Sequence, residues 1–354
     1  MLVHDPRLPI GHLVTMGALP SPVKKFIYRR LGYKIGKGVS IGFGSVVVGK
    51  DVEIGDHTDI GFASIVRGDR IRLDRHVSIG ALCVMDVPNL ELGEGTRATE
   101  MVIVGGPKLP ESSLKVGKNC ILMQMSFINP TLPIEIGDDS GVGGHCLLFT
   151  HGSWLSRFEG YPVTFAPITI GDSVWLPWRV FVMPGATIGD GSVIGADSLV
   201  AGEIPPQSLA VGSPAKVIRS APDFPRRLDD TKKNKVLDEI LDGMDQHLLA
   251  HGVKVERVGT RGTYKVRKKR RLGMFKRFDL RIRRLGDPGL EPGETPAVFV
   301  SLPEIPGPER ARLDAAGTMW IDIAKKERSE RSDDLGEEIV ERLVLYGVRL
   351  TRAR

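Results

Sequence analysis

Cysteines and aromatic residues are scarce in this sequence, and long apolar runs are missing. The 354-residue chain has 3 cysteines and 6% aromatic residues, with no CxxC motif and no Cys/His spacing typical of a metal site. No apolar stretch approaches the roughly 18 residues that span a bilayer. The first residues, interrupted by Asp5, Pro6 and Pro9, lack the continuous apolar segment of a signal peptide. We therefore expect a cytoplasmic protein with reduced thiols and no transmembrane segment.

Glycine and proline, in contrast, are abundant. The chain has 42 glycines and 24 prolines, nearly a fifth of its length, against about 12% in average usage. Such a composition disfavours a helical bundle, whose elements tolerate neither residue well. A hydrophobic content of 41% is too high for a disordered chain. The length is two to three times that of a usual domain, so we expect more than one structural unit.

A six-residue repeat dominates the middle of the chain. An aliphatic residue occupies every sixth position at Ile170, Leu176, Val182, Ile188, Ile194 and Val200, and mostly small or β-branched residues stand four places later, at 174, 180, 186, 192, 198 and 204. A period of six fits neither an α-helix nor a flat strand. It fits a short strand plus a turn, three per coil, with the aliphatic residue inside a triangular prism. Glycines at 171, 189 and 195 would supply corners with positive φ.

The same frame appears earlier in the chain. It runs through Ile35, Ile41, then after one extra residue Val48, Ile54, Ile60 and Val66, and returns at Ile79, at Val116, Leu122 and Ile128, and at Ile136, Val142 and Leu148. The cysteines (Cys83, Cys120 and Cys146) each lie four residues after a framing position, so we interpret them as buried core residues. The frame is loose over 86–115 and absent over 150–167. We expect loops there, where function tends to concentrate.

The segment 168–219, ITIGDSVWLPWRVFVMPGATIGDGSVIGADSLVAGEIPPQSLAVGSPAKVIR, carries a family resemblance. It resembles the closing segment of hexapeptide-repeat acyltransferases, specifically the sugar O-acetyltransferases of the maltose and colanic-acid type. This resemblance implies an all-β fold, a left-handed parallel β-helix over 34–219. The general crossover rule alone would give a right-handed coil. It also implies acetyl-CoA as co-substrate, no metal, and a homotrimer with active sites in the crevices between subunits.

The resemblance assigns a catalytic role to His151. Members of this branch carry a histidine in a Thr-His element before a loop that re-enters an I-x-IGD-x-x-W coil, here Thr150, His151, Pro167, Ile168, Ile170, Gly171, Asp172 and Trp175. Many relatives have a second histidine two places on, where this chain has Ser153. An imidazole has an ordinary pKa of about 6.5, so it can take a proton from a sugar hydroxyl and pass it to the thiolate that leaves acetyl-CoA. A solvated loop histidine is the alternative.

The other candidate site residues fall into two groups, one for each substrate. His145, Trp154 and Arg157 are candidates for acceptor binding. The resemblance places coenzyme A near the C-terminal end of the coil, and the candidates for binding it are Trp175, Trp178, Ser213, Pro214 and Lys216. For the tryptophans the alternative is packing between subunits, and for Lys216 a solvated surface position.

Residues outside 34–219 form the two ends of the chain. Ser21 and Pro22 precede an apolar stripe of Val23, Phe26, Ile27 and Leu31, which predicts a capping helix in an N-terminal arm over 1–33; membrane association is the alternative for this stretch. The hexapeptides stop before 220, so 220–354 is predicted to be a separate α+β domain. It should contain a helix ending at Gly252, strands over 254–284, a strand within 317–327, and a helix that Ser332 caps.

The C-terminal domain is locally basic. Between 261 and 284, twelve lysines and arginines (261, 265, 267–271, 276, 277, 281, 283 and 284) face a single acid, Asp279. An anionic glycan, or the diphosphate of a nucleotide-linked or lipid-linked sugar, suits this charge. Only Phe275 and Phe278 are interleaved and no nucleic-acid-binding motif occurs, which disfavours nucleic acid.

These observations predict acetyl transfer from acetyl-CoA to a hydroxyl of a sugar or surface-polysaccharide precursor. An N-acetyltransferase acting on an amino-sugar is an alternative, because the same base serves either nucleophile. A γ-class carbonic anhydrase-like zinc protein is another, because Ile65–Asp69 resembles the arginine–aspartate element of that class. However, zinc there needs three histidines with a four-residue gap, and five residues separate His145 from His151. The non-enzymatic alternative is a scaffold that binds polyanions.

Overall fold

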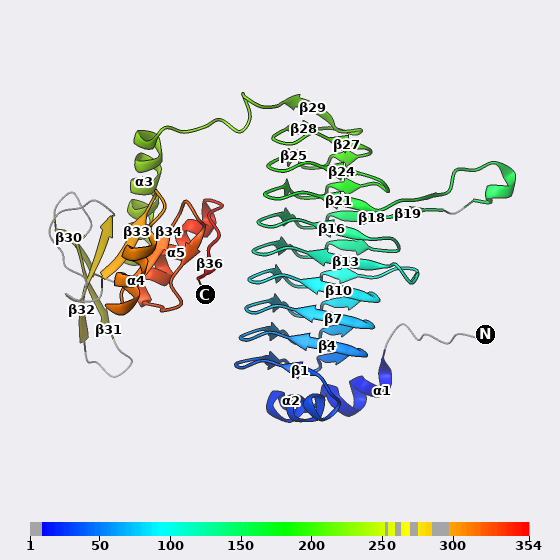
Figure 1. Cartoon of the computed structure of the whole chain (residues 1–354), viewed down its shortest axis with the longest axis horizontal. Coiled ribbons are helices and arrows are strands. Elements are labelled where there is room, and N and C mark those ends of the chain that lie inside the picture. Colours follow the sequence, from blue (N-terminus) through cyan, green and yellow to red (C-terminus); the bar gives the residue numbers. More distant parts are fainter. Residues whose placement is uncertain are drawn as a thin grey trace. The chain divides into compact units, whose positions relative to one another are not determined.

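The computed structural model describes residues 9–153, 155–251, 254–258, 263–269, 275–284 and 297–353. The chain divides into two compact units, Met1–Arg226 and Arg227–Arg354. The first is a three-sided, left-handed parallel β-helix preceded by a helix, and the second combines a sheet with helices (Figure 1). The predicted fold class, a left-handed parallel β-helix with an N-terminal helix and a smaller α+β domain, is confirmed.

Three sheets, here named A, B and C, form the sides of the β-helix. Sheet A consists of β1 (Lys34–Ile35), β4 (Asp51–Ile54), β7 (Arg70–Leu73), β10 (Asn89–Leu92), β13 (Ser113–Val116), β16 (Ile134–Ile136), β21 (Ile168–Ile170), β24 (Thr187–Ile188) and β27 (Glu203–Ile204). Sheet B consists of β2 (Ser40–Ile41), β5 (Asp59–Ile60), β8 (Ser78–Ile79), β11 (Arg97–Ala98), β14 (Ile121–Leu122), β17 (Gly141–Val142), β22 (Trp175–Leu176), β25 (Val193–Ile194), β28 (Leu209–Val211) and the antiparallel β29 (Lys216–Arg219). Sheet C consists of β3 (Val46–Val48), β6 (Ile65–Arg67), β9 (Val84–Asp86), β12 (Ile103–Val104), β15 (Phe127–Asn129), β18 (Leu147–Phe149), β23 (Phe181–Val182) and β26 (Leu199–Val200).

The six-residue repeat fills the interior as predicted. The framing residues Ile170, Leu176, Val182, Ile188, Ile194 and Val200 are each at most 2% exposed. The residues four places later are at most 5% exposed. Cys83, Cys120 and Cys146 are unpaired and buried, so their interpretation as core residues is confirmed. Each coil alone would leave its aliphatic side chains in water, so only stacking buries them.

Two parts of the predicted frame are wrong. Val47 is fully buried and Val48 is only half-buried, because the extra residue of the coil lies in the turn after Val48. The frame also continues through most of 86–115, where Leu92, Ala98 and Val104 are at most 2% exposed and pair in register with neighbouring coils. This coil was not predicted because its inward position 98 is an alanine, whose small side chain does not stand out as a hydrophobic residue of the repeat.

The frame glycines have a different role from the predicted one. Glycines at 171, 189 and 195 do not have positive φ, whereas His145 and Arg179, at corners of the β-helix, do. A Cβ atom added at Gly189 would lie 2.5 Å from the backbone nitrogen of Pro206 in the next coil. Close approach between coils, and not a left-handed backbone, therefore excludes a side chain at this position.

The N-terminal helix closes the first coil with polar groups. The chain enters through α1 (Ile10–His12) and the π-helical η1 (Leu13–Gly17), then forms α2 (Ser21–Arg30). The predicted apolar stripe is wrong, because Phe26 and Leu31 are exposed while Lys24 and Tyr28 are buried. The Lys24 ammonium donates to the carbonyls of Gly42 (2.6 Å) and Ser45 (2.9 Å). Unpaired backbone groups of the first coil need partners, and this need decides which face of α2 turns inward.

One long excursion interrupts the coils. Strand partners in sheet A are 18 residues apart between Thr169 and Thr187 but 34 apart between Glu135 and Thr169. The additional residues form an antiparallel pair, β19 (His151–Gly152) with β20 (Thr164–Phe165), and the 3-10 helix η2 (Arg157–Glu159) between them. This hairpin projects from the side of the β-helix (Figure 1).

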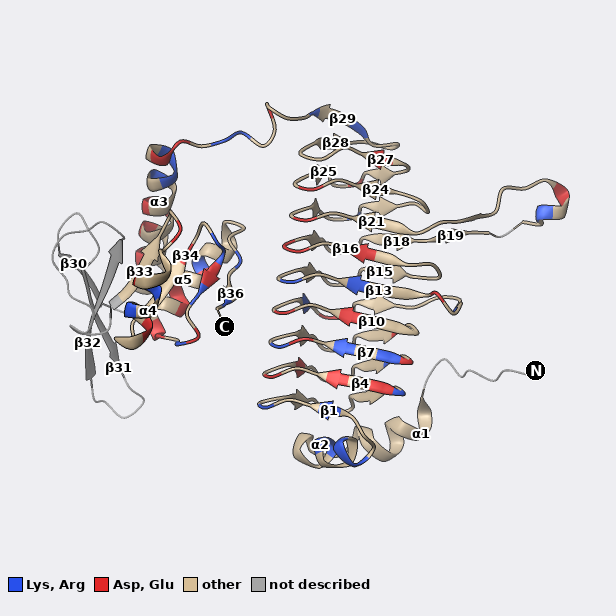
Figure 2. Cartoon of the chain, viewed as in Figure 1, with Lys and Arg blue, Asp and Glu red and all other residues tan. Residues whose placement is uncertain are grey.

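The outward faces of sheets A and C differ in polarity. Residues paired across sheet A alternate in charge along Lys34, Glu53, Arg72, Glu91, Lys115 and Glu135, which we name the sheet A ladder. Figure 2 shows this alternation of blue and red along the strands. The corresponding row on sheet C is apolar and comprises Val84, Ile103, Phe127, Leu147, Phe181 and Leu199, which we name the sheet C face. Opposite charges on neighbouring strands stabilise the sheet A ladder in water. The apolar side chains of the sheet C face gain no such stabilisation from contact with water.

The described residues of the C-terminal unit form a seven-stranded sheet and three helices. Its elements are α3 (Asp230–Ala250), β30 (Lys254–Val258), β31 (Thr263–Lys269), β32 (Phe275–Arg284), β33 (Ala297–Ser301), α4 (Gly307–Ala315), β34 (Met319–Asp322), β35 (Glu327–Arg328), α5 (Asp334–Leu345) and β36 (Thr351–Arg352). Leu237 and Leu241 of α3 pack with Ile339 of α5 in its core. The predicted basic segment falls partly on β31 and β32; its side chains, and positions 261, 270 and 271 altogether, lie outside the described residues.

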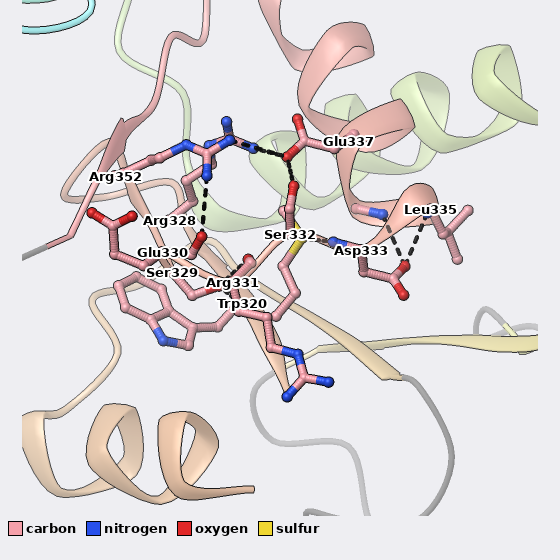
Figure 3. Close-up of polar contacts among 12 residues, drawn as sticks. Trp320, Arg328, Ser329, Glu330, Arg331, Ser332, Asp333, Leu335, Glu337 and Arg352 are labelled. Carbon is pink, nitrogen blue, oxygen red and sulfur yellow. Dashed lines mark hydrogen bonds and ion pairs between the residues drawn. The ribbon is translucent and has the colours of Figure 1, made fainter. Parts of the chain in front are cut away.

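The predicted cap of α5 is wrong by one residue. Asp333 is the N-cap, and its carboxylate accepts hydrogen bonds from the amides of Leu335 (2.9 Å) and Gly336 (3.4 Å). Figure 3 shows Ser332 turned instead toward the carboxylate of Glu337, to which its hydroxyl donates. Arg328 also donates to Glu337, at 2.6 Å. The carboxylate of Asp333 reaches the free amides of the first turn, so the hydroxyl of Ser332 is left to bond a side chain.

Candidate active site

The base of the hairpin is fixed to the preceding coil through Thr150. This residue follows β18 and is fully buried. Its hydroxyl donates to the carbonyl of Asn129 (2.9 Å) and accepts from the amide of Leu132 (2.9 Å), while its own carbonyl accepts from the amide of Ala166 (3.0 Å). The point where the chain leaves the β-helix and the point where it returns are therefore both held, and His151 projects from a rigid support.

Two kinds of contact hold the His151 imidazole. Its Nδ1 atom lies 3.1 Å from the hydroxyl oxygen of Thr131, and that hydroxyl donates to Oδ1 of Asn129 at 2.8 Å. The ring stacks on Phe165 of β20, with centroids 5.8 Å apart and planes 21° apart, and lies 6.4 Å from the ring of Phe149. His151 remains half-buried, so its ring is both held and reachable from solvent.

His145 lies at the opposite end of strand β18 from His151. It occupies the corner between sheets B and C with a φ of 57°, is exposed, and its ring lies 5.8 Å from that of Trp178. His151 follows His145 by six positions, which corresponds to about 20 Å in an extended chain. A single chain therefore does not bring these two candidates together.

Three of the five candidate coenzyme A residues follow the same corner as His145, and two lie on sheet B, Trp175 on β22 and Lys216 on β29. The indole of Trp175 covers Gly141, and that of Trp178, 41% exposed, covers Gly144 of the preceding coil. In the following coils, the carbonyl of Trp178 accepts from the amide of Asp197 (3.1 Å). Further along, the exposed Ser213, Pro214 and Lys216 follow the last coil. Trp178, Ser213 and Pro214 lie along the edge of the β-helix between sheets B and C, which we name the B/C edge.

The remaining acceptor candidates lie in the hairpin. Arg157 belongs to η2 and is exposed. Trp154 lies outside the described residues. The structure therefore places one of the two candidates at the surface of the hairpin, away from the contacts that hold His151.

Sequence reasoning missed the residues that hold His151. Thr131 and Asn129 lie in the preceding coil, and Phe165 lies on the returning strand of the hairpin. The pairing of neighbouring coils would have identified Thr131. Asn129 pairs with Phe149 across β15 and β18, so the residue two positions further on, Thr131, lies opposite His151. Finding that signal requires the register of the coils, which the sequence alone did not supply at the irregular coils.

The geometry gives no support to a zinc centre. Among the described residues, no group of three or more His, Cys, Asp or Glu side chains is arranged to hold a metal ion. Arg67 forms an ion pair with Asp86 (3.7 Å) and Asp69 with Lys50 (2.8 Å), both typical of charged pairs between coils. Within the part of the chain that the structure describes, no helix is long and apolar enough to cross a membrane.

The cysteines are unsuited to nucleophilic chemistry. Burial raises the pKa of the Cys120 thiol to about 12 and that of Cys146 to about 11. Burial also raises the pKa of the Cys83 thiol, because it disfavours the charged thiolate. A thiolate is the reactive form of cysteine, so these side chains are inert at neutral pH.

The fold and the imidazole at the base of the hairpin define a class: the chain resembles the hexapeptide-repeat acetyltransferases. No protein-family model matches it. A Schizosaccharomyces pombe protein named as an unverified acetyltransferase is 62% identical over 103 residues, 28% of this chain and 47% of that protein. A Staphylococcus aureus protein with a similarly unverified name is 44% identical over 106 residues, 29% and 50% of the two chains. A probable acetyltransferase of Mycobacterium tuberculosis is 36% identical over 114 residues, 31% and 38%. The chain thus spans about half the length, or less, of these curated relatives.

Solved structures of similar proteins are more distant in sequence. A hexapeptide-repeat acetyltransferase from Vibrio cholerae is 22% identical, and the similarity covers 59% of this chain and 87% of that one with a TM-score of 0.28. A galactoside acetyltransferase in complex with coenzyme A is 21% identical, with 61% and 81% covered and a TM-score of 0.29.

Proposed function

We propose that the β-helix unit transfers an acetyl group from acetyl-CoA to a hydroxyl of a sugar or surface-polysaccharide precursor, with His151 as general base. The observation that carries this proposal is the His151 imidazole, which is supported by Thr131 and Phe165 at the base of the hairpin and is half-exposed. The relatives named as acetyltransferases support the reaction class. The acetyl-CoA donor follows from the resemblance of the 168–219 segment.

The proposed reaction needs one base that acts twice. The imidazole removes the proton from the acceptor hydroxyl as its oxygen attacks the thioester carbonyl. A C–O bond forms, the C–S bond breaks, and the protonated imidazole returns the proton to the departing thiolate of coenzyme A. Such general acid–base catalysis contributes about 100- to 10,000-fold in rate.

A homotrimer would complete the site. In one chain, His151 and the B/C edge lie at opposite ends of the sheet C strands, so the base and the candidate coenzyme A residues Trp178 and Ser213 are apart. The sheet C face is apolar along six coils, whereas the sheet A ladder is charged and paired within the chain. Packing the sheet C face of one copy near the B/C edge of the next would bury the apolar row and bring the two groups together.

The experiment that tests this proposal monitors coenzyme A release from acetyl-CoA with a panel of sugar hydroxyl and amino-sugar acceptors. We expect turnover with a hydroxyl acceptor, and thermal stabilisation by millimolar coenzyme A. Turnover only with amino-sugars would establish the N-acetyltransferase alternative. No turnover together with no stabilisation would favour a polyanion-binding scaffold.

A further inference from the structure

Thr131 contacts both Asn129 and His151 through a hydroxyl that has a single hydrogen. The hydroxyl donates to Oδ1 of Asn129 at 2.8 Å, and its oxygen lies 3.1 Å from Nδ1 of His151. A threonine hydroxyl can donate once but can accept twice. With its hydrogen directed to Asn129, the hydroxyl can bond Nδ1 only by accepting, which requires a hydrogen on Nδ1.

Burial favours this arrangement. Thr131 is fully buried and Asn129 is 4% exposed, so water does not replace either partner readily. The backbone around them is also fixed: Ser112 donates to the carbonyl of Thr131 (2.7 Å), and Thr150 donates to the carbonyl of Asn129 (2.9 Å). If Thr131 turned its hydrogen toward His151, the side-chain carbonyl of Asn129 would remain buried without that donor, which is unfavourable.

We infer that Asn129 and Thr131 are positioning residues that hold His151 as the tautomer with hydrogen on Nδ1, leaving the lone pair on Nε2 as the base. What Nε2 does with that lone pair rests on the proposed function; the tautomer itself does not. The stacked ring of Phe165 fixes the plane in which Nε2 points. When Nε2 takes the proton of the acceptor hydroxyl, Nδ1 keeps its hydrogen and its bond to Thr131. Returning that proton to the thiolate restores the starting state without any rearrangement of the pair.

The tautomer can be measured directly by NMR on the full-length protein labelled with 15N-histidine. The chain has 8 histidines, and loss of one signal set in His151→Asn assigns the ring. At a pH where the ring is neutral, we expect hydrogen on Nδ1 and none on Nε2 in the unmodified protein and in Thr131→Ser, which keeps the hydroxyl. We expect Asn129→Leu to move the hydrogen toward Nε2, because the Thr131 hydrogen is then free to bond Nδ1. Thr131→Val should give a mixture of tautomers.

Activity provides the second readout. Thr131→Val should lower kcat roughly 10- to 100-fold, the loss seen when a metal-bound histidine loses its hydrogen-bond partner. The KM for acetyl-CoA should stay within about twofold, and Thr131→Ser should restore kcat. Thr58→Val is the matched control: Thr58 is also fully buried, and its hydroxyl donates to the carbonyl of Asp74 (2.8 Å) in another coil. This control should leave the tautomer and kcat unchanged.

The outcomes separate the tautomer from the function. A hydrogen on Nε2 in the unmodified protein, or a tautomer unchanged in both Thr131→Val and Asn129→Leu, would overturn the inference even if His151 is essential for turnover. A tautomer fixed as described, in a protein that keeps its activity without His151, would uphold the inference and remove the proposed base.

Discussion

The imidazole of His151 is held on one ring atom by a hydroxyl and across its face by a phenyl ring. If it is the general base, His151→Ala should lower kcat/KM by about 100- to 10,000-fold while leaving the coils intact, because no coil depends on its side chain. Coenzyme A release measures the activity, and thermal unfolding reports on the fold.

A histidine at a corner of the β-helix supplies the control for this substitution. His57 is exposed, has a φ of 57° and stacks on His76, on a coil distant from the hairpin. His57→Asn suits the left-handed backbone and should keep its activity. Near-normal turnover in His151→Ala would remove the catalytic assignment.

The three thiols give a test of the core at the same scale. Burial raises the pKa of the Cys120 and Cys146 thiols to about 12 and about 11, and that of Cys83 is raised too. At pH 8 the native protein should therefore react with iodoacetamide at none of its three cysteines, and in denaturant at all three, as mass spectrometry would detect. Rapid labelling of the native protein would show that the interior of the β-helix is open.

At the scale of elements, the contrast between sheets A and C is the basis for the proposed trimer interface. Ile103, 46% exposed, is the second of the six residues along the sheet C face, between Val84 and Phe127. If the proposed trimer forms through this face, Ile103→Glu should convert it into monomers, because the substitution would bury an unpaired carboxylate in the interface. Lys115→Gln, on the sheet A ladder, is the control and should leave assembly unchanged. Light scattering gives the mass; an unchanged mass in Ile103→Glu would place the interface elsewhere.

The repeat made the β-helix predictable because the same inward position recurs in every regular coil. Prediction failed where that position was hard to recognise. Ala98 is too small to stand out as hydrophobic, and the extra residue after Val48 led to a predicted frame that is off by one position. The inward face of the capping helix was predicted wrongly for a different reason. This face satisfies backbone carbonyls through Lys24, and a hydrophobic pattern does not reveal a hydrogen-bonding requirement.

The candidate site was only partly predictable. His151 could be located because it adjoins a recognisable break in the repeat. Thr131 could not, because its relation to His151 depends on how two unequal coils align in space, and the sequence separation of 20 residues has no special meaning until that register is known.

At the scale of the whole molecule, the chain joins two units with separate cores. The β-helix buries its own hydrophobic side chains, so deletion of 227–354 should leave it folded. If the basic C-terminal unit binds an anionic acceptor, this deletion should raise the KM for the acceptor more than that for acetyl-CoA. Steady-state kinetics of the two proteins provide the comparison. Equal changes in both KM values, or no change, would remove the acceptor-binding role.

The most direct test of the account is a crystal structure of the protein with coenzyme A bound. We predict that the sulfur lies beside the imidazole of His151 from one copy of the chain, with the remainder of the molecule along Trp178 and Ser213 of a neighbouring copy. A coenzyme A molecule bound far from His151, or lying wholly on one isolated chain, would contradict the proposed site.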